Sequence, residues 1–318
     1  MRGRFAPTPS GLMHIGNART ALLAWLQTRS AGGTFLLRME DVDTTRSRPE
    51  LAEQAIADLR WLGLDWDEGP DIGGDRSPYT QSERIDRYET ALAVLERKGR
   101  LYDCYCSRAE LTAVASAPHG LGSEGPAYPG TCRALMPEQR AARSRNKQPS
   151  LRFAIDSQAV RFDDAVAGPQ AFLPGAGGDF VVKRADGMMS YQLAVVVDDA
   201  AMGVTDVLRG ADLLDSTPRQ LQLYEALDLH PPRFAHVPLL YGTDGKRLAK
   251  RHGALSLAAL RASGATPEKV VGWLAAVSGL TDSIEPVRAS ELVGHFSVSL
   301  VRSDDVQVTD DMLSQLVD

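Results

Sequence analysis

The segment from Arg2 to Asn17 constrains the fold most, because it joins a short strand to a helix through a turn rich in proline and glycine. Arg2 to Ala6 is the expected strand, and the two prolines that follow end it, since proline cannot continue a hydrogen-bonded ladder. Gly11 and Gly16 flank His14 in the turn. A helix N-terminus has unpaired N–H groups and the positive end of a dipole, so this pattern indicates a nucleotide-phosphate site with His14 as an added donor. Its spacing is neither that of the Walker loop nor G-x-G-x-x-G.

The rest of the chain predicts an α/β fold with a parallel sheet covered by helices. Apolar periodicity predicts helices over Ala18–Arg29, Pro49–Leu62 and Ser82–Lys98, and strands over Thr34–Met39 and His236–Leu240. Tyr191–Val197 is a valine-rich apolar run, which favours a strand buried on both faces and ending at an acidic turn. Ser216 and the Thr-Pro pair after it predict a helix start, with the helix continuing to about Leu227.

The length of 318 residues suits two or three domains. The α/β pattern stops after Gly99 and returns near Tyr191, with cysteines, prolines and short β-like runs between them. We therefore expect the first half of a catalytic domain at 1–100, an inserted α+β subdomain at 101–185, the second half at 186–253 and a short helical C-terminal region at 254–318.

The net charge of −6 does not favour nucleic-acid binding by the surface as a whole. An RNA partner would require a local basic face, and two clusters could supply one: Arg140, Arg143, Arg145 and Lys147, then Lys246, Arg247, Lys250 and Arg251. No apolar run reaches the roughly 18 residues of a membrane helix. No signal peptide precedes the N-terminal motif, so we expect a cytoplasmic protein without membrane contact, and a monomer.

Three cysteines, Cys104, Cys106 and Cys132, lie close together in the sequence. Three thiolates suggest one structural Zn²⁺ per chain, which needs a fourth ligand. Ligand chemistry alone favours His119, because Cys₃His is a common set. Three reduced cysteines without metal remain the alternative.

The turn from His14 to Asn17 resembles the His-Ile-Gly-His signature of class I aminoacyl-tRNA synthetases, with Asn17 replacing the second histidine. The basic loop at Arg247–Arg251 resembles that class's Lys-Met-Ser-Lys-Ser loop, with only Lys250 retained in kind and Ala249 in place of serine. The resemblance implies that the protein adenylates a carboxylic acid with ATP and Mg²⁺. Catalysis of such a reaction comes mainly from positioning the two reactants and neutralising the charge of the phosphates. It implies catalytic His14 and Lys250, and ATP contacts from His14, Gly16, Asn17, Arg247 and Lys250.

Over roughly residues 2 to 255 the chain resembles the catalytic domain of glutamyl-tRNA synthetases, a Rossmann-type fold. The resemblance rests on five segments in that family's order: Arg4–Gly11, Leu37–Asp43, Leu62–Trp66, Tyr191–Asp199 and Val207–Leu213. It implies an L-glutamate pocket made by Arg4, Phe5, Ala6, Pro7, Thr8, Glu40, Tyr191 and Arg209. An acidic side chain suits the ammonium of glutamate, and a guanidinium suits its distal carboxylate. A buried ion-pair network of Arg4, Glu40 and Arg209 is the alternative interpretation.

The cysteine segment resembles the zinc site of glutamyl-queuosine tRNA(Asp) synthetases, which implies Tyr128 rather than His119 as the fourth ligand. The tail after Gly253 is also too short for the anticodon-reading region of a full glutamyl-tRNA synthetase. The chain thus resembles the stand-alone glutamyl-queuosine family, which transfers glutamate to the queuosine base of tRNA(Asp). A truncated glutamyl-tRNA synthetase that charges an acceptor end, and a catalytically silent tRNA-binding paralogue, are the alternatives.

Overall fold

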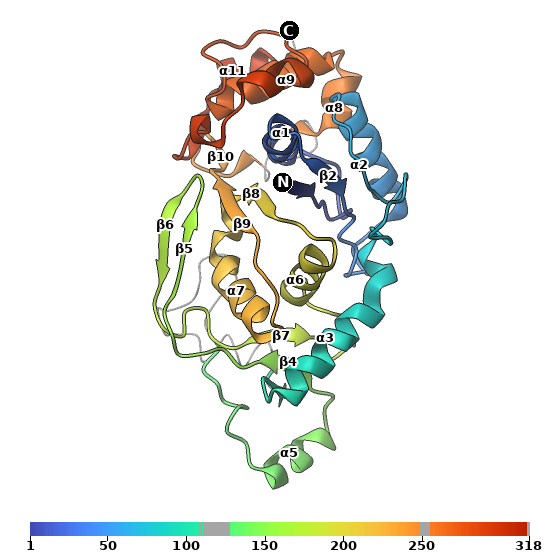
Figure 1. The fold of residues 1–318 in the computed structure, drawn as a ribbon, viewed down its shortest axis with the longest axis vertical. Helices are drawn as coiled ribbons and strands as arrows, with labels where there is room; N and C mark the ends of the chain where they lie inside the picture. Colours follow the sequence, from blue (N-terminus) through green and yellow to red (C-terminus); the bar gives the residue numbers. More distant parts are fainter. Residues whose placement is uncertain (108–109, 111–127, 249–254, 317–318) are drawn as a thin grey trace.

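The computed structural model describes residues 1–107, 110, 128–248 and 255–316. The molecule is elongated, with a sheet in its middle, the C-terminal helices at one end and α5 at the other (Figure 1). The α-helices are α1 (Ile15–Ser30), α2 (Pro49–Trp61), α3 (Ile85–Arg97), α5 (Pro137–Ser144), α6 (Tyr191–Ala201), α7 (Thr217–Ala226), α8 (Leu257–Ala262), α9 (Pro267–Ser278), α10 (Ala289–Leu292) and α11 (Asp310–Ser314). The strands are β1 (Arg2–Phe5), β2 (Thr34–Leu37), β3 (Leu101–Cys104), β4 (Ser150–Phe153), β5 (Val160–Asp164), β6 (Gly168–Phe172), β7 (Phe180–Lys183), β8 (Asp206–Gly210), β9 (Arg233–Val237), β10 (Leu240–Gly242) and β11 (Val306–Val308).

The main sheet has the strand order β2-β1-β8-β9-β5-β6. All of its pairings are parallel except the antiparallel β5–β6 pair at one edge. Helix α1 connects β1 to β2 and packs against the main sheet, and α9 from the C-terminal region packs against α1. The predicted α/β fold with a parallel sheet is therefore confirmed.

The prediction of a strand at Tyr191–Val197 is wrong, because these residues begin helix α6. Ser190 caps the helix by accepting a hydrogen bond from the Leu193 N–H. The first turns of α6 are buried on every side, packed among α3, α7 and β7, so the apolar run has no helical period. Burial of the whole helix, and not a pleated strand, explains the run of valines.

Smaller shifts affect two other predicted elements. Helix α1 begins at Ile15, three residues before the expected start, because His14 caps it. The strand expected at His236–Leu240 is observed at Arg233–Val237, and Leu240 starts the separate strand β10. The other predicted helices and strands agree with the structure within a few residues.

The range 101–185 contributes to two different sheets. Strands β3, β4 and β7 form a small antiparallel sheet near the protruding helix α5, as an inserted subdomain would. Strands β5 and β6 instead extend the main sheet, because Asp164 at the end of β5 pairs in parallel with Phe234 of β9. The middle of this range therefore belongs structurally to the main sheet.

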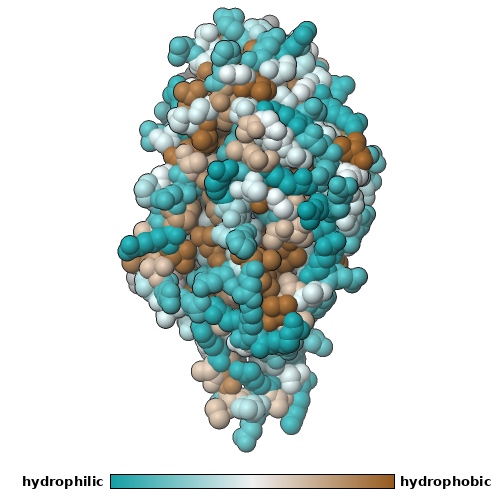
Figure 2. All heavy atoms as spheres, viewed as in Figure 1, coloured by the Kyte–Doolittle hydropathy of each residue, from teal (hydrophilic) through white to brown (hydrophobic). Residues whose placement is uncertain are grey.

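The C-terminal region consists mainly of short helices, with one strand, β11, that pairs in parallel with β10. Its central helix α9 buries Trp273 in the same core as α1. Figure 2 shows that one face of the molecule is mostly hydrophilic, with apolar side chains near its middle and near the C-terminal helices. Within the described ranges, no helix has both the length and the apolar character needed to cross a bilayer.

Candidate active site

A cavity of about 500 Å³ opens at the carboxyl ends of β1 and β8, where parallel α/β sheets commonly bind ligands. Its wall contains every residue predicted for glutamate or ATP that the structure describes: Arg4, Phe5, Ala6, Pro7, Thr8, His14, Gly16, Asn17, Glu40, Tyr191, Arg209 and Arg247. Lys250 lies outside the described residues. Residues as far apart in sequence as Arg4 and Arg247 thus meet in one hollow, although their individual roles remain predictions.

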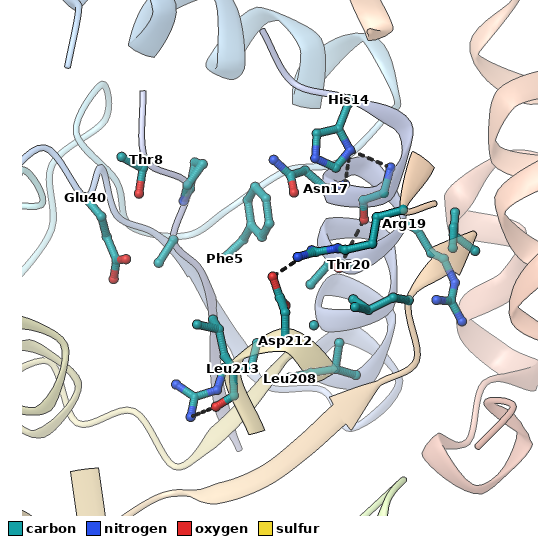
Figure 3. Close-up of a pocket in the computed structure, with 18 of the residues that line it drawn as sticks. Phe5, Thr8, His14, Asn17, Arg19, Thr20, Glu40, Leu208, Asp212 and Leu213 are labelled. Atoms are coloured by element: carbon teal, nitrogen blue, oxygen red, sulfur yellow. Dashed lines mark hydrogen bonds and ion pairs between the residues drawn. The ribbon is translucent and has the colours of Figure 1, made fainter. Parts of the chain in front are cut away.

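His14 is the N-cap of α1, as Figure 3 shows. Its Nδ1 accepts hydrogen bonds from the backbone N–H groups of Gly16, at 3.0 Å, and Asn17, at 3.4 Å. Burial, and then the nearby Arg247, lower the pKa of His14, so the ring is neutral at pH 7. His14 itself therefore occupies two of the N–H groups at the helix N-terminus. A neutral ring that accepts at Nδ1 carries its proton on Nε2, so His14 retains one donor of its own.

Gly16 is required by the close approach of the His14 ring. A Cβ atom at this position would lie 2.9 Å from Cε1 of His14, closer than real Cβ contacts allow. A larger residue would push the imidazole away from the end of α1. Gly11 has no such neighbour, so its freedom from a side chain is not required by packing in this state.

Arg247 forms a partly exposed ion pair with Asp212, in which Nη2 and Oδ2 are 2.8 Å apart. Asp212 is the second residue of the short 3-10 helix Ala211–Ser216 that follows β8, so the pair links the start of the basic loop to the carboxyl end of β8. This ion pair lies close enough to His14 to influence the pKa of the imidazole.

Two arginines and two carboxylates form a buried network beneath the cavity. Asp199 of α6 accepts hydrogen bonds from Nε and Nη2 of Arg4, at 3.3 and 3.2 Å, and lies 2.7 Å from Nη1 of Arg38. Arg38 also donates to Glu40 at 2.9 Å. Burial alone would raise the pKa of Asp199, but Arg4 and Arg38 hold it below its ordinary value. The network therefore pairs each of its charges and fixes Arg4 and Glu40 in the cavity wall.

Arg209 differs from these arginines because its hydrogen bonds go to neutral groups. Its Nε donates to Nε2 of His236 at 2.9 Å, and its Nη2 donates to Oγ1 of Thr217 at 2.9 Å and to the carbonyl of Leu213 at 3.3 Å. Its Nη1 is buried without a hydrogen-bond partner, and no carboxylate of the described chain lies within ion-pair distance. Burial lowers the pKa of Arg209, so the folded protein holds an incompletely compensated cation beside the cavity.

A second hollow of about 820 Å³ adjoins the first. The two share Thr8, Glu40, Arg46 and Tyr191, and the second extends to Cys104 and Cys106 of the inserted subdomain. Its wall also carries three further basic side chains, Lys147, Arg152 and Arg184. The arrangement offers space for a second, larger reactant next to the first cavity.

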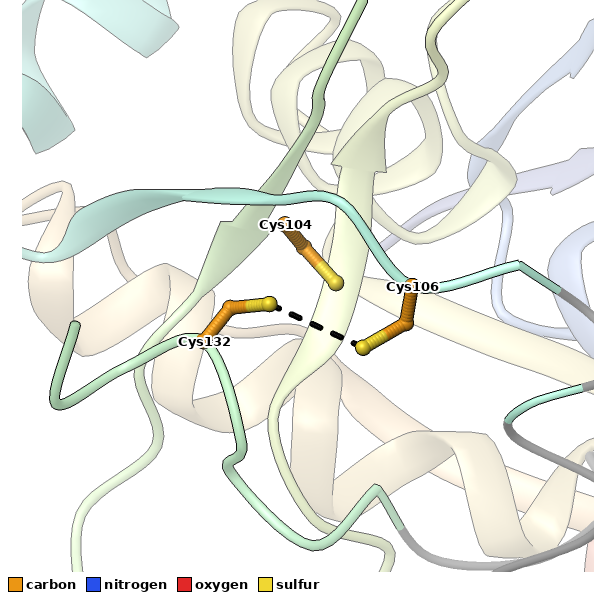
Figure 4. Close-up of side chains that lie close together, drawn as sticks. All are labelled: Cys104, Cys106 and Cys132. Atoms are coloured by element: carbon orange, nitrogen blue, oxygen red, sulfur yellow. Dashed lines mark hydrogen bonds between the residues drawn. The ribbon is translucent and has the colours of Figure 1, made fainter. Parts of the chain in front are cut away.

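The three cysteines converge, and their Sγ atoms lie within 4.8 Å of one another (Figure 4). The Cys106 and Cys132 sulfurs are 3.6 Å apart, close to the roughly 3.8 Å expected between thiolates on one tetrahedral zinc. The Tyr128 hydroxyl lies 3.5 Å from the Cys104 sulfur and 3.7 Å from the Cys106 sulfur. His119 lies outside the described residues. The donor set and its spacing fit a structural zinc ion.

The chain matches known proteins over nearly its whole length. Residues 1–313 match the family described as tRNA synthetases class I (E and Q), catalytic domain. The chain belongs to this family. A glutamyl-Q tRNA(Asp) synthetase of Symbiobacterium thermophilum is 65% identical over 99% of this chain and 98% of its own length. A glutamyl-Q tRNA(Asp) synthetase of Nitratidesulfovibrio vulgaris is 49% identical over 99% of this chain and 98% of its own.

The solved structures of this family agree with the fold. A glutamate tRNA ligase from Elizabethkingia meningosepticum, crystallised in complex with its amino acid, superposes with a TM-score of 0.85 at 28% identity. The match covers 99% of this chain but 68% of that one. This class I synthetase is therefore similar to the larger ligase over nearly all of its given length, and it spans about two thirds of that ligase.

Several residues of the synthetase site were not predicted. Arg38, Asp199, His236 and Thr217 each contact a predicted site residue, and Asp164 contacts His236. Alternation along the strand predicted at Thr34–Met39 puts Arg38 on the same side as Glu40, a signal that was available. Asp199 was interpreted as part of a turn, because the helix that carries it was read as a strand. For Asp164 and His236, which are far apart in sequence, no local pattern indicated a link to Arg209.

Proposed function

We propose that this class I synthetase activates L-glutamate with ATP and transfers the glutamyl group to the queuosine base in the anticodon of tRNA(Asp). The observation that carries the proposal is Arg209, a buried cation in the cavity wall whose own hydrogen bonds go to neutral groups. A buried charge without a counterion is costly, and a substrate carboxylate is the group that would compensate it. Two relatives called glutamyl-Q tRNA(Asp) synthetases, alike in length to this chain, support the identity of both substrates.

Glutamate recognition follows from the charges of the wall. Glu40 is held by Arg38 at one oxygen, Oε1, and faces the cavity, where it would accept the ammonium group of the substrate (Figure 3). Arg209 would bind the distal carboxylate, together with the Tyr191 hydroxyl, which has no hydrogen-bond partner in the described part of the chain. Arg4 is already bound to Asp199, so it would contribute a favourable electrostatic potential for the carboxylate rather than a second bidentate contact. Glutamine lacks the negative charge that Arg209 requires, and aspartate is shorter by one methylene.

Activation requires the α-carboxylate of glutamate to attack the α-phosphorus of ATP while pyrophosphate leaves. His14 would donate from Nε2 to the phosphate oxygens, because its Nδ1 is occupied by the end of α1. Arg247, together with Lys250 of the same loop, would neutralise the departing pyrophosphate. Bound Mg²⁺ would supply further neutralisation of the phosphate charge.

The transfer step moves the glutamyl group from the adenylate to the queuosine base and releases AMP. The second hollow begins at Thr8 and Glu40, next to the proposed adenylate, and would admit the modified base from the side of the inserted subdomain. Helix α5 and its flanks carry the basic residues Arg133, Arg140, Arg143, Arg145 and Lys147, with Glu138 as the only acidic residue between positions 133 and 147. This local excess of positive charge suits RNA phosphates in a protein that is otherwise acidic.

We also infer that the cysteine cluster binds a structural Zn²⁺ with Tyr128 as its fourth ligand. Burial would raise the pKa of Cys104, but hydrogen bonds from Tyr128 and Arg152 hold it below the ordinary value, which favours the thiolate that a metal needs. Arg152 also stacks on the Tyr128 ring, with Cζ 3.9 Å from the ring centroid. A neighbouring cation would help the phenol to lose its proton on metal binding.

Two assays test the proposed function. The first measures glutamate-dependent exchange between ATP and pyrophosphate without tRNA, with aspartate and glutamine as controls; no exchange with any of the three would contradict an enzyme of this kind. The second measures transfer of labelled glutamate to tRNA(Asp) that contains or lacks queuosine. Label should appear only on the queuosine-containing tRNA. Equal labelling of both would support charging of the acceptor end instead.

A further inference from the structure

A chain of three buried side chains runs from the main sheet to the cavity. Asp164 at the end of β5 lies with Oδ2 2.6 Å from Nδ1 of His236 on β9. Nε2 of the same imidazole accepts the 2.9 Å hydrogen bond from Nε of Arg209 on β8. The side chains of Asp164 and His236 are fully buried, and neither lines the cavity. They therefore reach a substrate only through Arg209.

The hydrogen bonds of this chain admit one arrangement of protons. The Nε of Arg209 is always a donor, so Nε2 of His236 must be unprotonated. The ring proton is then on Nδ1, where it is donated to Asp164. The carboxylate is itself held in place, because Oδ1 accepts from the backbone N–H groups of His236, Val166 and Ala167 at 2.9, 3.0 and 2.8 Å. Asp164 thus fixes both the orientation and the tautomer of the imidazole.

We propose that Asp164 and His236 are positioning residues for glutamate recognition, which hold Arg209 in the orientation that binds the substrate's distal carboxylate. The inference rests on the proposed function, since it takes Arg209 as the group that meets glutamate. Arg209 has no carboxylate to fix it directly, so its orientation depends on His236, Thr217 and the Leu213 carbonyl. His236 accepts from Nε, and Thr217 and Leu213 accept from Nη2, so Nη1 is the guanidinium nitrogen left without a partner among the described residues.

The topology explains why Asp164, from the expected insertion, lies in the main sheet beside His236 and Arg209. Strand β5 pairs in parallel with β9, so Asp164 lies beside the strand that carries His236. The next pairing, β8 with β9, puts Arg209 opposite His236 in the register. Three adjacent strands thus supply the carboxylate, the imidazole and the guanidinium in spatial order.

Acid should disrupt this arrangement. A second proton on His236 would place an N–H on Nε2 against the N–H of Arg209, and two buried donors would face each other. The charged or titratable groups that face the ring are Asp164 from β5, Arg209 from β8 and Arg4 from β1, and the Thr217 hydroxyl of α7 lies 3.2 Å from Nε2. Burial, assisted by the two arginines, outweighs Asp164 and lowers the pKa of His236, so the ring is neutral at pH 7. Glutamate binding should then weaken only as the pH falls through this lowered pKa, which lies below the ordinary histidine value of about 6.5.

The test uses Asp164→Asn, which keeps an oxygen for the three backbone N–H groups but offers an N–H to Nδ1 of His236. The ring proton must then move to Nε2, against Arg209. We expect the KM for glutamate in ATP–pyrophosphate exchange to rise about tenfold or more, with the KM for ATP nearly unchanged. Asp163→Asn, at the exposed neighbouring position, is the matched control. Ring ¹⁵N NMR should report the Nδ1–H tautomer in the wild-type protein and the Nε2–H tautomer in D164N.

A second variant separates positioning from general damage. His236→Gln keeps an acceptor near Nε2 but has no ring to change tautomer or to titrate. D164N should therefore add little to the KM for glutamate in the H236Q background, and the acid-dependent rise in KM should disappear in H236Q. The inference is overturned if D164N matches D163N, if it raises the KM for ATP as much as that for glutamate, or if its effect is equally large in H236Q. If the wild-type protein shows no glutamate-dependent exchange, the proposed function fails, and the NMR comparison still decides whether Asp164 sets the tautomer.

Discussion

Replacing Arg209 by methionine should separate substrate binding from stability. In the free protein this guanidinium is buried without a carboxylate partner among the described residues, and burial lowers its pKa. Removing the guanidinium removes the cost of its desolvation, but it also removes its hydrogen bonds. Nε2 of His236, which loses its donor, can instead accept from the Thr217 hydroxyl 3.2 Å away. The two effects are similar in size, so the free energy of unfolding should change by no more than about 1 kcal/mol.

Glutamate binding should respond very differently to Arg209→Met. The distal carboxylate would enter a buried site without its counterion, which costs about 3–5 kcal/mol when one partner of a buried pair is missing. Since about 1.4 kcal/mol corresponds to a factor of ten, the KM for glutamate in ATP–pyrophosphate exchange should increase by a factor of roughly one hundred to a few thousand. The KM for ATP should change little, because the proposed nucleotide contacts come from other residues.

Arg38→Met is the matched control, since Arg38 is equally buried but pairs with Glu40 at 2.9 Å and with Asp199 at 2.7 Å. Its removal leaves two buried carboxylates short of a partner and should lower the free energy of unfolding by about 3–5 kcal/mol. Urea unfolding of both variants without ligands measures the difference. The reasoning is refuted if R209M loses as much stability as R38M, or if R209M binds glutamate as the wild-type protein does.

Three further outcomes follow from the described geometry. Tyr128→Phe should lower the zinc content of purified protein while His119→Ala does not; retained zinc in the first with loss in the second would identify His119 as the ligand. Because burial and Arg247 lower the pKa of His14, the unfolded chain takes up a proton near pH 6.5 that the folded chain does not, so stability should decrease as the pH falls below that value. An H14N variant can still cap the helix but does not titrate, so its free energy of unfolding, measured across pH, should lack this contribution. A pH dependence equal to that of the wild-type protein would contradict the assignment to His14. Replacing Arg140 and Arg145 by glutamate should reduce glutamate transfer to tRNA(Asp) far more than ATP–pyrophosphate exchange, with a weaker dependence on salt; equal transfer by variant and wild type would exclude α5 from the RNA interface.

Local patterns were reliable where one short segment determines the outcome. The turn from Pro7 to Gly16 ends a strand and starts a helix by its own backbone chemistry, and both elements are present in the structure. The cysteine spacing likewise predicted a cluster, and the three sulfurs meet. The same reasoning failed at Tyr191–Val197, because a helix buried on all sides and a buried strand share the same apolar composition.

From the amino-acid sequence alone we could name the residue types available for the chemistry: the turn at His14, the proposed glutamate-pocket residues Arg4, Glu40 and Arg209, and the cysteines. The pairing of their charges became clear from the tertiary structure. Arg4 is paired with Asp199, whereas Arg209 is left with neutral partners, because the parallel order of β5, β9 and β8 brings an imidazole between it and Asp164. Ion pairing depends on distances of a few ångströms between segments far apart in sequence, and those distances are set by strand order and helix packing rather than by any local pattern.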